Sequence, residues 1–176
     1  MPEIIREELR MNRPTMPSGS QVLEKAFAES AGKTVDVVID QEVVGVTPEM
    51  FFWWLDGKLM DNYTMWHPEQ HVSAKIEFPP SGPPIVTIEE HVGAYHTVFH
   101  CLATGHDLVL VNRDGKRMGG IVHVVEPSPR GTKLRTTFTF PANTPAAFIE
   151  SMYGHSVYEM QDLSRFLPEL YRQHKK

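Results

Sequence analysis

The stretch from Asn143 to Lys176 constrains the fold most, because it has the pattern of one long amphipathic helix. Asn143 or Thr144 suits the N-cap, and Pro145 suits the first helical position. Few strong helix breakers precede Pro168, so we expect roughly twenty or more helical residues, about 30 Å at 1.5 Å per residue. A helix of this length in a globular protein buries an apolar stripe against another layer.

Two polar residues lie inside that predicted stripe. Because His155 and Glu159 are four residues apart, both side chains project toward the core. Burying an unpaired carboxylate costs several kcal/mol, so a compensating partner is expected. A hydrogen bond between the two residues in a wet groove would compensate it, and so would a metal ion. The whole stripe consists of Phe148, Met152, His155, Glu159, Leu163, Phe166 and Leu170.

Composition indicates a soluble protein with one domain. The 176 residues are enough for a substantial core, with 41% hydrophobic and 22% charged residues. A net charge of −5 argues against a nucleic-acid partner. The single cysteine, Cys101, excludes an intrachain disulfide framework and fits a reducing compartment. We expect a cytoplasmic protein with no membrane partner, because no apolar run reaches a membrane span and the start, MPEIIREELR, lacks a signal core.

The first seventy residues divide at turn-forming and helix-starting residues. We expect a domain over residues 33–176, preceded by a separate arm. The helix that starts at Thr47-Pro48-Glu49 is apolar nearly all round, which indicates burial or the cover of a cavity. The expected elements are an arm over 1–32 with a short helix at Gln21–Ala31, a strand at Lys33–Val46, a helix over 47–57 and an irregular or helical connection at Lys58–His71.

From Val72 to Phe140 the pattern is that of β-strands joined by clear turns. The predicted strands are Val72–Phe78, Pro84–Gly93, Ala94–Leu102, Asp107–Asn112, Arg117–Glu126 and Thr132–Phe140. A strand, short helices, about six antiparallel strands and a long helix form an α+β helix-grip fold, in which a curved antiparallel sheet surrounds the C-terminal helix. Such a fold usually encloses a cavity between sheet and helix, which is the default ligand site.

One predicted strand carries an acid on its apolar face. With a period of two, Val86, Ile88, Glu90 and Val92 share that face. Glu90 is therefore the carboxylate expected in the core, and Glu89 is the one expected in solvent. A one-residue bulge would exchange the two.

Nine histidines is a high count, and several stand in apolar company. His71, just before a strand, can point into the cavity mouth, whereas His67, before a proline, suits the surface or the surroundings of a site. His96 and His100 lie two pleats apart, roughly 13 Å, which is too far to share one ion, so we expect structural or cavity-lining roles. His123 is either a satisfied core group or an acid–base group inside the cavity.

Several familiar catalytic patterns are absent from the sequence. It has no glycine-rich phosphate loop and no G-x-S-x-G nucleophile elbow. Pro68 occupies the position of the required Glu in an H-E-x-x-H metalloprotease motif. Cys101 lacks an activating context and is expected to be an inert core thiol. The candidates for apolar walls around a flat ring, each of which could equally belong to the core, are Trp53, Trp54, Trp66 and Phe138.

The order of these motifs resembles the 2,4-diacetylphloroglucinol hydrolases and phloretin hydrolases. The resemblance covers roughly residues 45–165 and implies a Bet v 1/START-like helix-grip core with bound zinc. It also implies hydrolysis of the carbon–carbon bond between a phenolic ring and an acyl group. The elements that carry it are Tyr63, Trp66-His67-Pro68-x-x-His71, the Glu-Glu-His-Val-Gly segment at 89–93, and His155-x-x-x-Glu159.

The resemblance further implies which residues hold the metal and the substrate. The implied ligands are His71, Glu90, His155 and Glu159, and two imidazoles with two carboxylates suit zinc ahead of manganese or iron. Tyr63 and His123 would hold the phenol and carbonyl oxygens of a small phenolic ketone and serve in catalysis. Phe138 stands where the family pattern has a second substrate-contacting tyrosine.

Two other classes of function compete with the hydrolase. A metal-free helix-grip protein could carry small molecules, and a polyketide cyclase-like enzyme would use cavity His and Tyr residues without metal. In either case His155 and Glu159 would pair across a wet cavity. The apolar first helix of the domain and the N-terminal arm could also form a homodimer.

Overall fold

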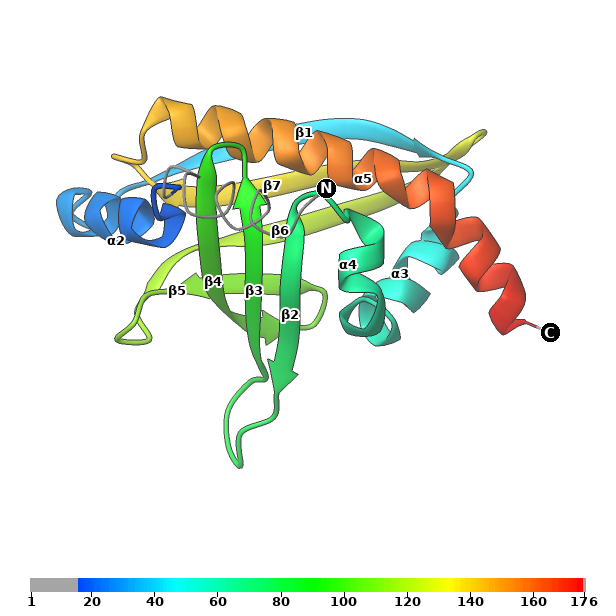
Figure 1. Cartoon of the computed structure of the whole chain (residues 1–176), viewed down its shortest axis with the longest axis horizontal. Helices are drawn as coiled ribbons and strands as arrows, with labels where there is room; N and C mark the ends of the chain where they lie inside the picture. Colours follow the sequence, from blue (N-terminus) through cyan, green and yellow to red (C-terminus); the bar gives the residue numbers. More distant parts are fainter. Residues whose placement is uncertain (1–15, 176) are drawn as a thin grey trace, which may run out of the picture.

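The computed structural model describes residues 16–175, so residues 1–15 of the expected arm lie outside the described part. The described chain forms one antiparallel sheet and a long C-terminal helix (Figure 1), which confirms the predicted helix-grip architecture. Its elements are α2 (Gly19–Glu29), β1 (Thr34–Val44), α3 (Pro48–Gly57), η1 (Met60–Asn62), α4 (Tyr63–Trp66), β2 (His71–Glu77), β3 (Ile85–Val92), β4 (Tyr95–Thr104), β5 (Asp107–Val111), β6 (Arg117–Ser128), β7 (Gly131–Pro141) and α5 (Ala146–His174).

The sheet has seven strands in the order β1-β7-β6-β5-β4-β3-β2. The pairing of β1 with β7 joins the first and last strands of the chain, from Thr34 opposite Pro141 to Val44 opposite Gly131. In Figure 1, β2, β3 and β4 run across the direction of β6 and β7, and α5 crosses the whole sheet. Gly119 permits close approach at the bend, because a Cβ there would lie 1.9 Å from the Thr139 carbonyl oxygen. The curvature creates the space beneath α5.

The two short helices predicted near the start of the domain are both present, α3 at its predicted start and α2 shifted by two residues. Thr47 caps α3 by accepting a hydrogen bond from the Met50 N–H at 3.3 Å, and Pro48 occupies its first turn. Ser18 caps α2, which starts two residues before the predicted range and packs its buried face on the sheet. The Ser20 hydroxyl donates to the Val98 carbonyl at 2.8 Å and fixes α2 against β4.

Helix α5 continues past Pro168, the first strong helix breaker in its sequence. It begins at Ala146 with Pro145 at the N-cap position, and it continues through Pro168 to His174. The predicted stripe is incomplete near its end. Leu167 and Tyr171 are the buried residues there, since they follow Leu163 at intervals of four residues, close to the 3.6 residues of one turn. Phe166 and Leu170 are half-buried, and Phe166 packs against the apolar cluster that contains Leu163. Among residues 16–175, no helix combines the length and apolar character that crossing a membrane requires.

Two apolar clusters hold α5 on the sheet. The first joins the N-terminal half of α5 to α2 and the sheet through Phe148 and Met152. The second joins the C-terminal half to α3 and α4 through Leu163 and Leu167. His155 and Glu159 lie on the buried face between these clusters, so packing on both sides fixes their position.

Phe148→Ala tests how strongly α5 depends on the first cluster. Phe148 is fully buried and packs edge-on against Tyr95 and Phe140, with ring centroids 5.2 and 6.1 Å away. We expect the free energy of unfolding to fall by about 3–5 kcal/mol in urea titrations. Tyr158→Ala removes an exposed ring from the same helix and should change it by less than about 0.5 kcal/mol. Equal losses in the two variants would contradict this account of the core.

Candidate metal centre

Strands β2 and β3 and helix α5 bring the four predicted metal ligands together between the sheet and the helix. His71 is the first residue of β2 and pairs in register with Glu90 on β3. His155 and Glu159 lie one turn apart on α5, which crosses above that pair. All four residues are buried. His71 is sealed from solvent, so the expectation that it points into the cavity mouth is wrong.

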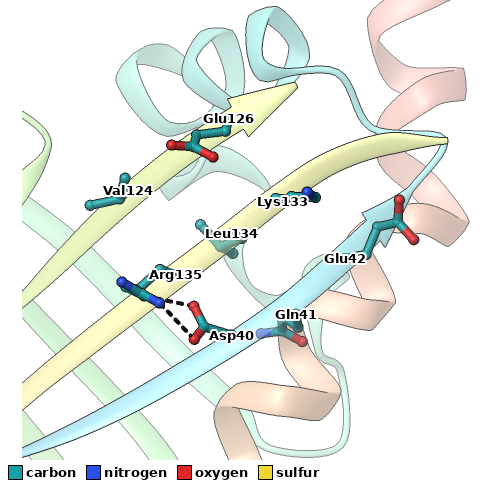
Figure 2. A pocket seen from close by; sticks show the side chains of 8 residues that line it. All are labelled: Asp40, Gln41, Glu42, Val124, Glu126, Lys133, Leu134 and Arg135. Carbon is teal, nitrogen blue, oxygen red and sulfur yellow. Dashed lines mark hydrogen bonds and ion pairs between the residues drawn. The ribbon is translucent and has the colours of Figure 1, made fainter. Parts of the chain in front are cut away.

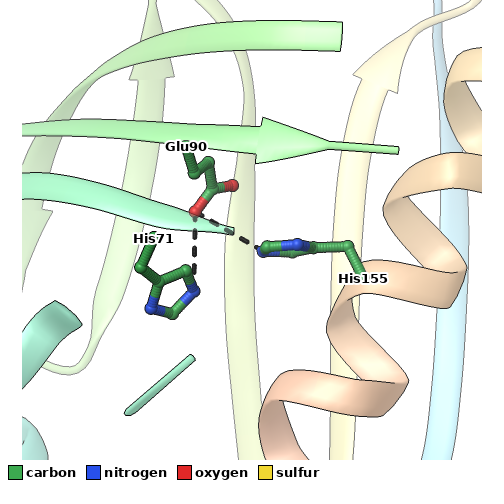
Figure 3. A group of neighbouring side chains, drawn as sticks. All are labelled: His71, Glu90 and His155. Carbon is green, nitrogen blue, oxygen red and sulfur yellow. Dashed lines mark ion pairs between the residues drawn. The ribbon is translucent and has the colours of Figure 1, made fainter. Parts of the chain in front are cut away.

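The ligand atoms lie within range of one another (Figure 3). One atom each from His71, Glu90 and His155 form a group in which every separation is below 4.8 Å. Glu90 Oε2 lies 3.8 Å from His71 Nε2 and 3.5 Å from His155 Nε2. Glu159 Oε2 lies 3.3 Å from His71 Nε2 and 3.6 Å from His155 Nε2, so its carboxylate faces both imidazoles.

Hydrogen bonds orient both imidazole rings toward the centre. His71 Nδ1 donates to the Tyr63 carbonyl oxygen at 2.9 Å, and His155 Nδ1 donates to the Gln70 side-chain oxygen at 2.5 Å. Each ring therefore presents Nε2 to the carboxylates. Both Nε2 atoms are buried and make no hydrogen bond. Two buried imidazole lone pairs and two carboxylates are a donor set that fits a divalent metal ion.

The charges of the centre are strongly coupled. Burial raises the pKa of Glu90. The neighbouring His155 and the Tyr63 hydroxyl lower that pKa by more than burial raises it, so the net shift is downward. Burial lowers the pKa of His155, but Glu90 and Glu159 outweigh it and raise that pKa to about 9. The two carboxylates therefore require a positive charge between them, whether a proton on His155 or a metal cation.

Tyr63 connects this centre to the adjoining cavity. Its hydroxyl donates to Glu90 Oε2 at 2.5 Å, and its ring stacks on His71 with centroids 4.0 Å apart and planes 6° apart. Burial and the Glu90 carboxylate raise the pKa of the phenol far above its usual value. Tyr63 is thus a neutral hydrogen-bond donor at physiological pH.

Several residues surround and support the ligands. His67 is buried beside His71 and His155, which agrees with the second of the two places that the sequence allowed it, and its Nδ1 lies 2.6 Å from the Asp162 carboxylate. The supporting roles of Gln70 and Asp162 were not identified from the sequence. Trp66 Nε1 donates to the Glu159 carbonyl oxygen at 2.5 Å. Asp162 lies seven residues after His155, a helical spacing that could have placed it on the same face. Gln70 carries no comparable signal.

A cavity of about 380 Å³ opens beside the centre. His123 lines it from β6, with Nδ1 3.1 Å from the Thr136 hydroxyl, and burial lowers its pKa, so the ring is neutral. Trp66 and Phe138 also line the cavity. Trp53 and Trp54 do not, and of the two roles that the sequence allowed them they take the one in the core: Trp54 packs against Trp66 in the second apolar cluster, and Trp53 packs against Tyr171.

The remaining histidines and the thiol lie outside the centre. Glu89 is on the solvent side of β3, as the alternation predicts, and pairs with His96 at 2.9 Å. His100 faces Thr87 at 3.4 Å and is exposed, so neither histidine lines the cavity. Cys101 is fully buried, and burial raises its pKa to about 12, in agreement with an inert thiol.

A second hollow lies on the outer surface of strands β1, β7 and β6 (Figure 2). Three of its five charged side chains have partners within the protein. Arg135 makes two hydrogen bonds to Asp40, at 2.7 and 2.9 Å, and Glu42 accepts from Ser128 and Arg130. Gln41 is its one lining residue whose buried side-chain polar atoms make no hydrogen bond, whereas several buried polar groups converge at the first cavity, which is therefore the stronger ligand site.

Solved structures similar to this one share its fold at low sequence identity. Ara h 8.0201 is 12% identical, with a TM-score of 0.57 over 77% of this chain and 98% of the other. The major latex-like protein 151 of Panax ginseng is 8% identical, with a TM-score of 0.57 over 76% and 97%. A START superfamily protein of Mycobacterium smegmatis is 13% identical, with a TM-score of 0.52 over 79% and 99%. These similarities establish a Bet v 1/START-like fold.

The sequence comparisons are more specific about family. No curated protein matches the chain. A family model described as DAPG hydrolase PhiG domain matches residues 9–111, which is more than half of the 176 residues and includes Tyr63, His71 and Glu90. The chain belongs to the DAPG hydrolase PhiG domain family.

Proposed function

We propose that this protein is a zinc-dependent hydrolase that cleaves the carbon–carbon bond between a phenolic ring and an acyl group. The observation that carries the proposal is the pair of buried imidazole Nε2 atoms facing two buried carboxylates beside an apolar cavity. The reaction consumes one water molecule. The bond from ring to carbonyl breaks, the acyl carbon gains the water oxygen and leaves as a carboxylic acid, and the ring carbon gains a proton.

His71, Glu90, His155 and Glu159 would hold the ion. Zinc bound there would supply Lewis acidity, which polarises a ketone and lowers the pKa of water. Manganese and iron accept the same donors, but a set of two imidazoles and two carboxylates favours zinc. The burial of the site keeps bulk water away and strengthens electrostatic interactions within it.

The protein's own groups would orient the substrate and move protons. The Tyr63 hydroxyl, next to Glu90, is placed to hold a substrate oxygen at the edge of the centre. His123 is neutral and uses Nδ1 toward Thr136, which leaves Nε2 for a phenol or for proton delivery to the ring carbon. Phe138 supplies an apolar wall for a flat ring.

A metal-free carrier or a polyketide cyclase-like enzyme is the alternative. The apolar cavity alone would suit either one. In both, protonated imidazoles would have to balance the two carboxylates, although their Nε2 atoms lie 3.3–3.8 Å from the carboxylate oxygens and make no hydrogen bond, whereas a metal ion could take all four groups as ligands. That difference favours the metalloenzyme.

Metal content of the purified protein tests the proposal directly. Elemental mass spectrometry should find about one zinc per chain, and His155→Ala should lose both the metal and the cleavage of acyl-phenols, because two carboxylates would remain with one imidazole. His96→Ala removes a histidine from the solvent side of the sheet and should keep both. Full metal occupancy in His155→Ala would show that His155 is not a metal ligand.

The pH dependence of zinc affinity provides a second test. His155 must lose its proton to bind metal, and its pKa in the metal-free protein is about 9. Zinc affinity should therefore rise about tenfold per pH unit between pH 6.5 and 9 and level off above that range. Calorimetry in buffers of different ionisation enthalpy should detect about one proton released per ion at pH 7. A flat affinity over this range would contradict the predicted proton competition.

Gln70 should influence the metal without touching it. Its side-chain oxygen accepts the His155 Nδ1–H at 2.5 Å, which orients the ring. Gln70→Leu should lower zinc affinity by about 10- to 100-fold. It should also lower the unfolding free energy of the metal-free protein by about 1–3 kcal/mol, because the buried His155 Nδ1–H loses its acceptor. Gln173→Leu, which removes a surface glutamine bonded to Glu169, is the matched control and should leave affinity unchanged. Wild-type affinity in Gln70→Leu would contradict this role.

A further inference from the structure

The cavity extends along strand β3 away from the metal centre. Glu90, Ile88 and Val86 line it from the same face of the strand, and Pro84 continues the wall. The six-residue interval from 90 to 84 corresponds to about 20 Å at 3.3 Å per residue. One aromatic ring with a short acyl group occupies only part of that length, so most of the cavity is left for another portion of the ligand.

The far end of this cavity is open and apolar. Phe78, just after β2, lines the cavity although its side chain is 75% exposed, and Ile76 beside it is 37% exposed. Asp56 and His106 form an ion pair at 2.8 Å on the opposite rim. His71, at the other end of β2, is sealed from solvent. The metal centre is therefore the closed end, and an exposed phenyl ring stands at the mouth.

Hydrogen-bonding groups are scarce between these two ends. Eight lining side chains can form hydrogen bonds. Tyr63, Glu90, His155 and Glu159 belong to the metal centre, Trp66 donates to the Glu159 carbonyl oxygen, and Asp56 and His106 pair with each other. His123 is the remaining one, and the rest of the described lining is apolar apart from Gly105. A ring hydroxyl buried here without a partner would lower affinity by about 5- to 150-fold.

We infer, on the basis of the proposed hydrolase function, that the substrate is a phenolic ketone with few ring hydroxyls and a long apolar acyl chain. The ring lies at the metal centre between His123 and Phe138, and the chain follows β3 past Val86 to Phe78. Hydrolysis breaks the bond between ring and carbonyl, transfers the water oxygen to the acyl carbon, and protonates the ring carbon. The products are a sparsely hydroxylated phenol and a long-chain carboxylic acid.

Kinetics of zinc-loaded protein on two substrate series test this inference. One series varies the acyl group of 2-hydroxyphenyl ketones from acetyl to dodecanoyl, and the other varies the number of ring hydroxyls at constant chain length. Each fully buried methylene is worth up to about fourfold in affinity, so the six methylenes from acetyl to octanoyl could raise kcat/KM by up to about 4,000-fold, and we expect a rise of about 100-fold, roughly half of that free energy. Trihydroxy rings should bind about 5-fold or more weakly than monohydroxy rings, measured as dissociation constants, because added hydroxyls also activate the ring toward protonation and change kcat.

Two variants locate the effect in the structure. Phe78→Ser should reduce the ratio of octanoyl to acetyl kcat/KM, because it removes the apolar rim. Tyr158→Ser removes an exposed ring that does not line the cavity and should keep the wild-type ratio. Phe138→Tyr adds a hydroxyl to the ring wall and should reduce the penalty for polyhydroxylated rings.

The outcomes separate this inference from the proposed function. Cleavage of acyl-phenols with a flat or falling chain-length series would overturn the inference and leave the hydrolase intact. Cleavage of none would overturn the hydrolase. In that case, quenching of tryptophan fluorescence by 4-alkylphenols would test whether the cavity binds an alkyl chain, because Trp66 lines the cavity. Affinity that rises with alkyl length would support an apolar chain site, and equal affinities would reject it.

Discussion

The burial of Glu90 and Glu159 at one point beneath α5 is the constraint on which the rest of the structure depends. Two carboxylates withdrawn from water repel each other and lose their hydration, which costs far more than one favourable contact returns. His71, His155 and the Tyr63 hydroxyl surround them and supply positive charge or hydrogen bonds. These compensating groups come from β2, α5 and α4, so the centre forms only when all three elements are in place.

Packing on both sides of the centre fixes the positions of its side chains. The apolar clusters around Phe148 and Leu163 fix α5 at two points, and the polar turn containing His155 and Glu159 lies between them. A rotation of one residue would turn both side chains by about 100° and separate them from β2 and β3. The β2–β3 register supplies the other half of the site, because it sets His71 opposite Glu90.

Sequences only 8–13% identical share this curved sheet and long helix, which indicates that many different sets of core residues can satisfy the fold. In this chain two buried carboxylates and two buried imidazoles lie together beside the cavity, and they distinguish this site from its apolar surroundings. The apolar remainder of the cavity then governs which molecule can approach them.

Much of the fold was predictable from local patterns. The period of two along β3 placed Glu90 inside and Glu89 outside, and the helical period placed His155 beside Glu159 in the core. Those rules express geometry within one element, which the sequence of that element carries. The same rules missed Leu167 and Tyr171 near the end of α5, which are buried against α3 and its neighbours, whereas Phe166 is half-buried against Trp54 and Leu170 is half-buried, because α3 sets which side of the last turns is covered.

The sequence by itself therefore determined the order of elements and the inward direction of the polar side chains. Tertiary structure decided which inward residues meet. Gln70 supports His155 across 85 positions of sequence, and Asp162 contacts His67 across 95. Trp54 packs in the core, whereas Trp66 reaches the cavity. These outcomes depend on how far the sheet curves and where α5 crosses it, quantities set by the packing of all layers together and by no single segment.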